Sequence, residues 1–210
     1  SFIFARQCGF FDKILISTDS KKYKKIAQEF GAEIPFLRPK SISKDNSTDL
    51  EFVQHCLKYL IKKENYNPDF IVHLRPTSPL RKIKDIKKGL KILIQNTKID
   101  SVKSISLNTH PVYKIWNKSK NNIIKPIVKN DSRFNEPHNA PRQYLPKSYI
   151  QTALFDIYRV KSISKNFLSG KKIYGLITDK MLDIDSKEDF NDIKNHKKKF
   201  KKFFKFIKKK

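Results

Sequence analysis

Residues 12–31, DKILISTDSKKYKKIAQEFG, decide the fold because their hydrophobic pattern changes from one typical of a strand to one typical of a helix. The first part, residues 12–18, is a short and nearly continuous apolar run, as in a strand buried on both faces. The second part places four apolar side chains on one face of a helix: Tyr23, Ile26, Ala27 and Phe30. Asp19 or Ser20 can cap the start of this helix, and Gly31 sits where its C-cap is expected. The stretch therefore predicts a strand followed by a helix.

The same alternation continues along the chain. Further strands are predicted at residues 68–74 and 100–107, and amphipathic helices at residues 48–64 and 83–94. Thr48 and Glu51 have the spacing of a capping box at the start of the first of these helices. Strands that alternate with helices indicate right-handed crossovers. The sequence therefore predicts an α/β fold of three layers, with a mostly parallel sheet covered by helices.

The periodic pattern is interrupted between residues 108 and 148. Prolines, asparagines and isolated aromatic side chains replace it there, which predicts an excursion or subdomain that carries Trp116. Strand-like runs return at residues 149–160 and 171–178, and a final helix is expected from Ser186, with that serine as its cap. We expect one domain over residues 1–195, including the excursion, and a separate basic tail over residues 196–210.

The composition of the chain argues against two classes of function, membrane-spanning proteins and nucleic-acid-binding proteins. No apolar run approaches the length that spans a bilayer, and the first residues lack the pattern of a signal peptide, so a cytoplasmic location is expected. The net charge is +26, but the 46 basic residues include only seven arginines, the side chain that best reads base edges. Ten lysines also fall in residues 194–210 alone. Nucleic acid is therefore not the expected partner.

The tail has its own pattern. Apolar side chains at helical spacing alternate with lysines there: Phe200, Phe203, Phe204 and Ile207. Such a stripe could contact an acidic membrane surface or a partner. The alternative, which we favour, is an extension of the last helix that packs on the domain.

Polar segments follow the predicted strands. They are STDS (residues 17–20), RPTSPLR (75–81) and LDIDS (182–186), and FLRPKSISKDNST (36–48) lies close by in sequence. In open α/β sheets, ligands bind beyond the carboxyl ends of the strands. Hydroxyl groups and arginines suit phosphate oxygens, and carboxylates suit a hard cation. These segments together predict a nucleotide site.

The chain resembles the acylneuraminate cytidylyltransferases, which make CMP-activated sialic acids for surface glycans. The resemblance runs from Phe10 to about Asn195 and rests on six motifs in order: FDKILISTDS (11–20), FLRPKSISKD (36–45), LRPTSPLR (74–81), DSVKSIS (100–106), RQYLP (142–146) and LDIDSKEDF (182–190). It implies a Rossmann-like nucleotidyltransferase fold, CTP and an acidic sugar as substrates, and Mg²⁺ as the cofactor. It also implies a reaction in which the anomeric hydroxyl of a 2-keto sugar acid attacks the α-phosphate of CTP and expels pyrophosphate. Such chemistry depends on positioning and charge neutralisation.

The resemblance also implies roles on the nucleotide side. Asp183 and Asp185 match the family's magnesium-binding acids, which makes them the expected catalytic and metal-binding residues. The structural alternative is a polar strand end before the helix cap. Arg38 matches a residue that contacts the cytidine nucleotide, and Ser47 and Thr48 fall beside it, although Thr48 is also the helix cap.

Arg75 is a departure from the family's pattern. It replaces a glutamine of the family, and because arginine only donates hydrogen bonds, base selectivity is in question there.

On the sugar side, Lys114 and Arg142 fall near positions that bind the substrate carboxylate. In QTALFDI (151–157), Gln151, Thr152 and Asp156 are expected to contact the sugar. This motif also departs from the family, which shows Asn-Gly and a tyrosine where this chain has Thr152-Ala153 and Asp156. The sugar acid could therefore be N-acetylneuraminate or a related nonulosonic acid.

The start of the chain also departs from the family's pattern. The family's opening strand and phosphate loop are missing, so we expect these 210 residues to be a truncated chain that alone binds CTP poorly and catalyses little. By analogy with the family, the excursion of residues 108–148 is expected to form a homodimer. The alternatives that stay open are a nucleotidyltransferase for another acid sugar, such as Kdo, and a non-catalytic basic binding module.

Overall fold

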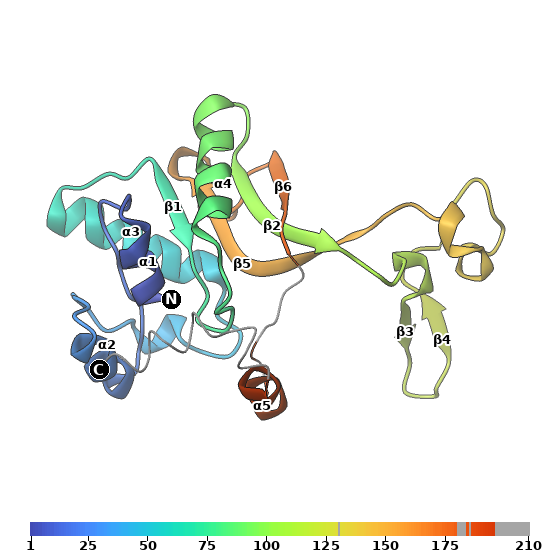
Figure 1. The fold of residues 1–210 in the computed structure, drawn as a ribbon, viewed down its shortest axis with the longest axis horizontal. Helices are drawn as coiled ribbons and strands as arrows, with labels where there is room; N and C mark the ends of the chain where they lie inside the picture. The colour runs from blue at the N-terminus through green and yellow to red at the C-terminus, as the bar shows by residue number, and fades with distance from the viewer. Residues whose placement is uncertain (130, 180–183, 185, 196–210) are drawn as a thin grey trace.

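The computed structural model describes residues 1–129, 131–179, 184 and 186–195, and it consists of an α/β body from which one arm projects (Figure 1). The body holds a four-stranded sheet in the order β1-β5-β2-β6. β5 runs antiparallel to both of its neighbours, whereas β2 and β6 are parallel. The strands span Phe70–His73 (β1), Ser101–Leu107 (β2), Tyr149–Arg159 (β5) and Ile173–Ile177 (β6). The sheet is therefore mixed: β1, β2 and β6 run in one direction, and β5 runs in the opposite direction. The predicted α/β class is confirmed.

The described helices are α1 (Phe2–Cys8), α2 (Lys21–Glu29), α3 (Asp49–Glu64), α4 (Ile83–Gln95) and α5 (Lys187–Asn195). Three of them, α2, α3 and α5, begin at a predicted capping residue. At the start of α3, the Thr48 backbone N–H donates to the Glu51 carboxylate at 2.6 Å, completing the capping box. The Ser20 hydroxyl accepts from the backbone N–H of Tyr23 at 3.3 Å, and Ser186 caps α5 through the backbone N–H of Asp189 at 3.1 Å.

The core lies between α4 and the centre of the sheet. Ile86 and Leu93 of α4 are fully buried against Val102 of β2 and against Phe155 and Ile157 of β5. Burying a side chain of this size contributes about 1.5–3 kcal/mol. The amphipathic pattern of α4 therefore fixes which face of the sheet it covers, and β5, the central antiparallel strand, carries much of the core.

Of the two elements predicted in residues 12–31, the helix is confirmed and the strand is wrong. Residues 12–18 are not a strand, because no ladder partner for them exists among the described residues; Thr18 accepts one backbone hydrogen bond, from Arg38 at 2.8 Å. The helix predicted after them exists as α2, but none of its residues is buried. Tyr23 remains 63% exposed and Phe30 38% exposed, so this apolar face is not covered by the described part of the body.

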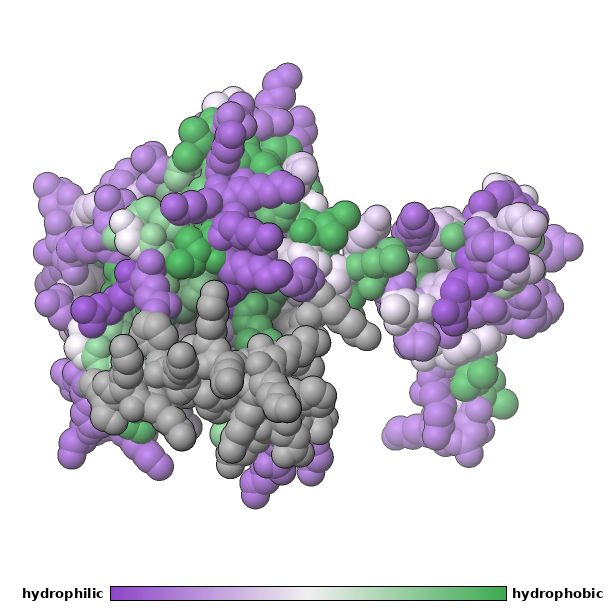
Figure 2. Space-filling view, in the orientation of Figure 1, coloured by the Kyte–Doolittle hydropathy of each residue, from purple (hydrophilic) through white to green (hydrophobic). Residues whose placement is uncertain are grey.

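The excursion predicted at residues 108–148 forms the arm. It contains a two-stranded hairpin of β3 (Trp116–Lys118) and β4 (Ile124–Pro126) and several short 3-10 turns, including η2 (Val112–Lys114) and η4 (Arg142–Tyr144). Figure 2 shows the arm standing apart from the body, with an apolar patch on the hairpin. Ile123, Ile124 and Ile127 are each about half exposed or more, at 61%, 51% and 49%.

No helix among the described residues is both long and apolar enough to cross a lipid bilayer. The basic tail, residues 196–210, lies outside the described part of the chain.

Candidate active site

The loop of residues 75–81 leaves the carboxyl end of β1 and is held by internal hydrogen bonds. The Arg81 guanidinium is buried and donates to the backbone carbonyls of Leu154 and Arg75. In the same loop, the carbonyl of Thr77 accepts from the backbone N–H of Ile184 at 3.0 Å. Ile184, the residue between Asp183 and Asp185 in the sequence, therefore contacts this loop through its backbone.

The two carboxylates that flank Ile184 in the sequence, Asp183 and Asp185, lie outside the described residues, so their role as magnesium ligands stays a prediction. Elsewhere in the described ranges, no group of three or more histidine, cysteine, aspartate or glutamate side chains is arranged to hold a metal ion.

Arg75 and Asp156 meet at the centre of the site. The Arg75 guanidinium donates to Asp156 Oδ2 at 2.8 Å through Nη1 and to Asp49 Oδ2 at 2.5 Å through Nη2. The Asp156 side chain is completely buried. It also accepts from Gln151 Nε2 and from the Tyr158 hydroxyl, each at 3.2 Å. Two of the residues that depart from the family's pattern, Arg75 and Asp156, are thus direct partners.

This cluster shifts the ionisation of its members. Burial alone would lower the pKa of Arg75, but the hydrogen bond and charge of Asp156, together with Asp49, raise it. Burial raises the pKa of the Tyr158 phenol, and the Asp156 charge adds to that rise. Burial and the Arg75 charge lower the pKa of His73, so its imidazole is neutral at pH 7. The cluster therefore holds an ionised arginine and a phenol that stays protonated.

A bulge in β5 shapes the sugar side of the site. Lys103 of β2 pairs with Asp156, but Ile105 pairs with Gln151, so β5 carries extra residues opposite Ser104. The Ser104 hydroxyl fills this gap by donating to the Phe155 carbonyl at 2.9 Å and accepting from the Phe155 N–H at 3.2 Å. Gln151 and Asp156 are five positions apart on the same strand. Because the bulge shortens the distance between them, they share one hydrogen-bonded cluster.

Thr152, a predicted sugar contact, is buried in the bulge. Its side chain is 1% exposed, and its hydroxyl lies 3.3 Å from that of Thr178. Thr178 follows β6 and donates to the Ile105 carbonyl at 3.2 Å. Of the three residues predicted in QTALFDI, Gln151 is thus the one with an exposed side chain.

The predicted nucleotide contacts gather near the start of α3. Arg38 Nε donates to the Ser43 hydroxyl at 2.9 Å, and its Nη2 lies 3.7 Å from Asp19. The Ser47 hydroxyl accepts from the Lys44 N–H at 3.0 Å, and Thr48 begins the capping box. Arg38, Ser47 and Thr48 therefore have local structural partners, which leaves a nucleotide role open beside the structural one.

Asp49, His73 and Tyr158 belong to the site but were not predicted. Asp49 reads in the sequence as an ordinary acid in the first turn of a helix. The available signal was Asp156 itself, because an acid in the apolar run LFDIY requires buried partners. That signal indicates that a partner exists, but it does not identify Arg75, which is 81 positions away.

Lys114 and Arg142 lie on the arm and are both exposed. Figure 1 shows the arm extending away from the body, so the structure does not bring these two cations to the other predicted site residues of the same chain.

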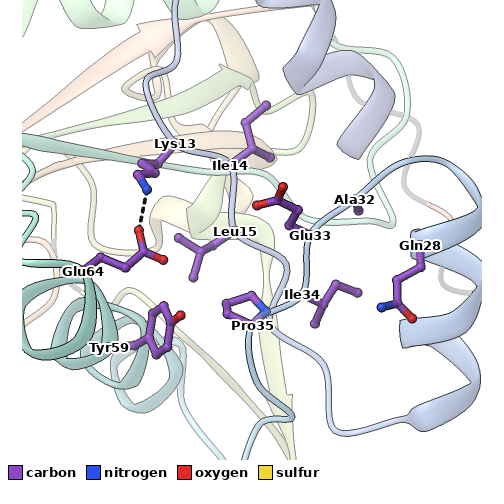
Figure 3. A pocket seen from close by; sticks show the side chains of 10 residues that line it. All are labelled: Lys13, Ile14, Leu15, Gln28, Ala32, Glu33, Ile34, Pro35, Tyr59 and Glu64. Atoms are coloured by element: carbon purple, nitrogen blue, oxygen red, sulfur yellow. Dashed lines mark hydrogen bonds and ion pairs between the residues drawn. The ribbon is translucent and has the colours of Figure 1, made fainter.

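A separate pocket of about 380 Å³ lies at the other end of α3 (Figure 3). Its walls include Ile14, Ile34 and Tyr59, and the 2.5 Å ion pair between Lys13 and Glu64 lies at one side of it. Since α3 runs from Asp49 to Glu64, roughly 22 Å of helix separates this pocket from the Arg75 cluster. The glutamates that line it would also repel phosphate groups. The pocket is therefore distinct from the candidate active site.

The mixed α/β sheet, with loops rich in hydroxyl groups and arginines converging near the end of β1, is the arrangement expected of a nucleotidyltransferase. Within this class, the chain belongs to the cytidylyltransferase family, whose profile matches residues 2–205.

Relatives and solved structures agree with this assignment. The chain is 27% identical over 188 residues to an N-acylneuraminate cytidylyltransferase of Escherichia coli, covering 89% of this chain and 42% of that protein. It is 25% identical over 189 residues to a pseudaminic acid cytidylyltransferase of Campylobacter jejuni, covering 88% and 78%. Its fold is similar to that of a CMP:2-keto-3-deoxy-manno-octonic acid synthetase solved with CTP, with a TM-score of 0.60, 10% identity and coverage of 92% and 85%. The chain thus spans less than half the length of the E. coli relative.

Proposed function

We propose that this protein transfers CMP from CTP to the anomeric hydroxyl of a nonulosonic acid and releases pyrophosphate. The observation that carries the proposal is the membership of residues 2–205 in the cytidylyltransferase family. Relatives named for N-acylneuraminate and pseudaminic acid support an acidic 2-keto sugar as the acceptor.

In the proposed reaction, the anomeric oxygen forms a bond to the α-phosphorus of CTP. The bond between that phosphorus and the bridging oxygen to the β-phosphate breaks, pyrophosphate leaves, and the hydroxyl proton passes to solvent or a base. Asp183 and Asp185 would hold Mg²⁺, which neutralises phosphate charge when bound. The cationic side chain of Arg38, near the start of α3, would position the nucleotide. The protein's contribution is then mainly orientation and electrostatic stabilisation.

The arm supports a homodimer as the active form. Lys114 and Arg142 would bind the sugar carboxylate, yet both are carried on the arm, away from their own body. A projecting arm can bring such cations to the site of a second copy. The exposed isoleucines of the hairpin provide an apolar surface for that contact.

The reaction itself is tested with the full-length protein, CTP, Mg²⁺ and a panel of acids: N-acetylneuraminate, legionaminate, pseudaminate and Kdo. We expect a CMP-sugar by chromatography, and equimolar pyrophosphate, with at least one nonulosonic acid. Asp183→Asn is the control that should lose magnesium-dependent turnover. No CMP-sugar with any of the acids would contradict the proposal, and turnover of Kdo alone would assign the protein to the alternative acid sugar.

The dimeric site is tested by mixing two inactive variants, Arg142→Ala and Asp183→Asn. If the arm serves the partner's body, the mixed dimer has one complete site and regains activity. If each chain uses its own arm, the mixture stays inactive.

A further inference from the structure

We propose that Arg75 and Asp156 form an internal positioning pair, which aligns the nucleotide side and the sugar side of the site without contacting either substrate. The inference rests on the proposed function. It assigns to both residues a role different from the ligand contacts that the resemblance implies.

Asp156 has the geometry of an internal anchor. Its carboxylate is completely buried, and it accepts hydrogen bonds from Arg75, Gln151 and Tyr158. A buried carboxylate is tolerated only with a counter-ion and satisfied oxygens. These donors satisfy that requirement from within the protein, which leaves no exposed face for a sugar.

Arg75 connects this anchor to the nucleotide side. One branch of its guanidinium binds Asp156 on β5, and the other binds Asp49, the first residue of α3. Asp49 directly follows Ser47 and Thr48, the predicted nucleotide contacts. The planar fork of arginine fixes the two carboxylates relative to each other. A shift of Arg75 would therefore move the start of α3 relative to β5.

The pair also orients Gln151 on the sugar side. The Gln151 amide nitrogen donates to Asp156, and its carbonyl oxygen accepts from Lys103 Nζ at 3.5 Å. Gln151 is thus the exposed member of the cluster, and the buried carboxylate determines which of its atoms faces a ligand.

The charge balance argues against Arg75 as a ligand-binding cation. Its charge is compensated by two carboxylates within 2.8 Å, and its side chain is 23% exposed. A substrate anion would meet Asp49, which is more exposed at 41%, as well as the arginine.

The test uses full-length protein carrying Arg75→Gln, Asp156→Asn, both changes together, or Arg75→Lys. Lys13→Gln, which removes the distant exposed ion pair to Glu64, is the matched control. KM and kcat for CTP and the sugar acid, and the affinity for Mg²⁺-CTP by calorimetry, are measured at a temperature where circular dichroism shows each variant folded. The double variant leaves no unpaired buried charge, so it should fold even if a single variant does not.

We expect each single change to raise KM for the sugar acid at least tenfold, and to weaken CTP binding in the case of Arg75→Gln. The double variant should be no worse than the poorer single variant, because both changes break one unit. Arg75→Lys should restore only part of the loss, since lysine cannot bridge both carboxylates, and Lys13→Gln should stay within twofold of wild type.

Two results would overturn the inference. KM values and CTP affinity unchanged within twofold in folded Arg75→Gln protein would reduce the pair to a stabilising contact. Multiplicative losses in the double variant would mean that each residue contacts substrate independently. Wild-type protein that binds CTP but converts no acid would instead contradict the proposed function. The calorimetric CTP affinities of wild type and the variants would still test the positioning role of Arg75 and Asp156.

Discussion

At the scale of single residues, Ala153 stands out because its backbone is left-handed. Its φ is +52°, a conformation that costs a residue with a Cβ about 1–2 kcal/mol. It lies in the β5 bulge, next to the buried Thr152 and two residues from the exposed Gln151. The strain is held in place by the packing of the bulge, which is a common arrangement next to ligand sites.

Ala153→Gly is therefore expected to stabilise the protein. Glycine removes the left-handed cost but adds unfolded-state entropy of about 0.4–1 kcal/mol, so the net gain should lie between about 0 and about 1.6 kcal/mol. Thermal or urea unfolding measures it. Ala140→Gly is the control, because Ala140 has an ordinary φ of −66° and should lose stability on the same change. Equal losses at both positions would show that the strain at Ala153 is negligible.

At the scale of elements, the turn before β6 depends on a close approach of Gly170 to Asp100. Asp100 accepts from the backbone N–H groups of Lys171 and Lys172 at 2.8 and 2.9 Å, and from the Ser162 hydroxyl at 2.7 Å. These bonds lower its pKa, the Lys172 N–H contributing most. They join the start of β2 to the residues that lead into β6.

Gly170→Ala is expected to destabilise this turn strongly. Gly170 has a φ of +68°, and an added Cβ would lie 2.4 Å from the Asp100 Cβ. Gly9→Ala is a matched control, since Gly9 has a φ of +66° but open space around its Cβ position. We expect about 1–2 kcal/mol of lost stability at Gly9, and about 1–3 kcal/mol more at Gly170, by chemical denaturation. Similar losses at the two glycines would contradict the steric argument.

Local signals in the sequence predicted the elements better than their partners. The caps of α2, α3 and α5 depend on residues three positions apart, so spacing alone identified them. Strand partners depend on the whole chain. The alternation of strands and helices does not reveal that β5 runs antiparallel between β1 and β2. The apolar run at residues 12–18 predicts a strand, but the described residues give it no ladder partner.

The same difference explains the site. Motifs predict that the loop of residues 75–81 and the start of α3 lie in one region, and the hydrogen bond from Arg75 to Asp49 agrees with that. The sequence did not predict that Arg75 and Asp156 bind each other, because the contact depends on the β5 bulge. A pattern of residue types indicates which chemistry is available. The pairing of the strands decides which of those side chains bond to each other and which remain available to a ligand.

At the scale of the whole molecule, the arm should control assembly. Ile124 is 51% exposed on the hairpin, where Figure 2 shows an apolar patch. Ile124→Lys is expected to convert the proposed dimer to a monomer in sedimentation experiments, because a charge would have to be buried at the interface. Ile94→Lys changes an isoleucine of α4 that is 64% exposed and should leave the assembly intact. A wild-type monomer, or a dimer that survives the Ile124 change, would contradict this role of the hairpin.

The two ends of the arm lie side by side. The Asn108 N–H donates to the Ser148 carbonyl at 2.9 Å, and the flanking Leu107 and Tyr149 pair within the β2–β5 ladder. The arm is therefore a closed excursion from a continuous antiparallel pair, and a short turn could replace it without changing the pairing of the strands. Changes in its length or sequence are mechanically insulated from the core. A change in the arm would therefore alter what the arm carries, its two cations and its apolar hairpin, while the body keeps its shape.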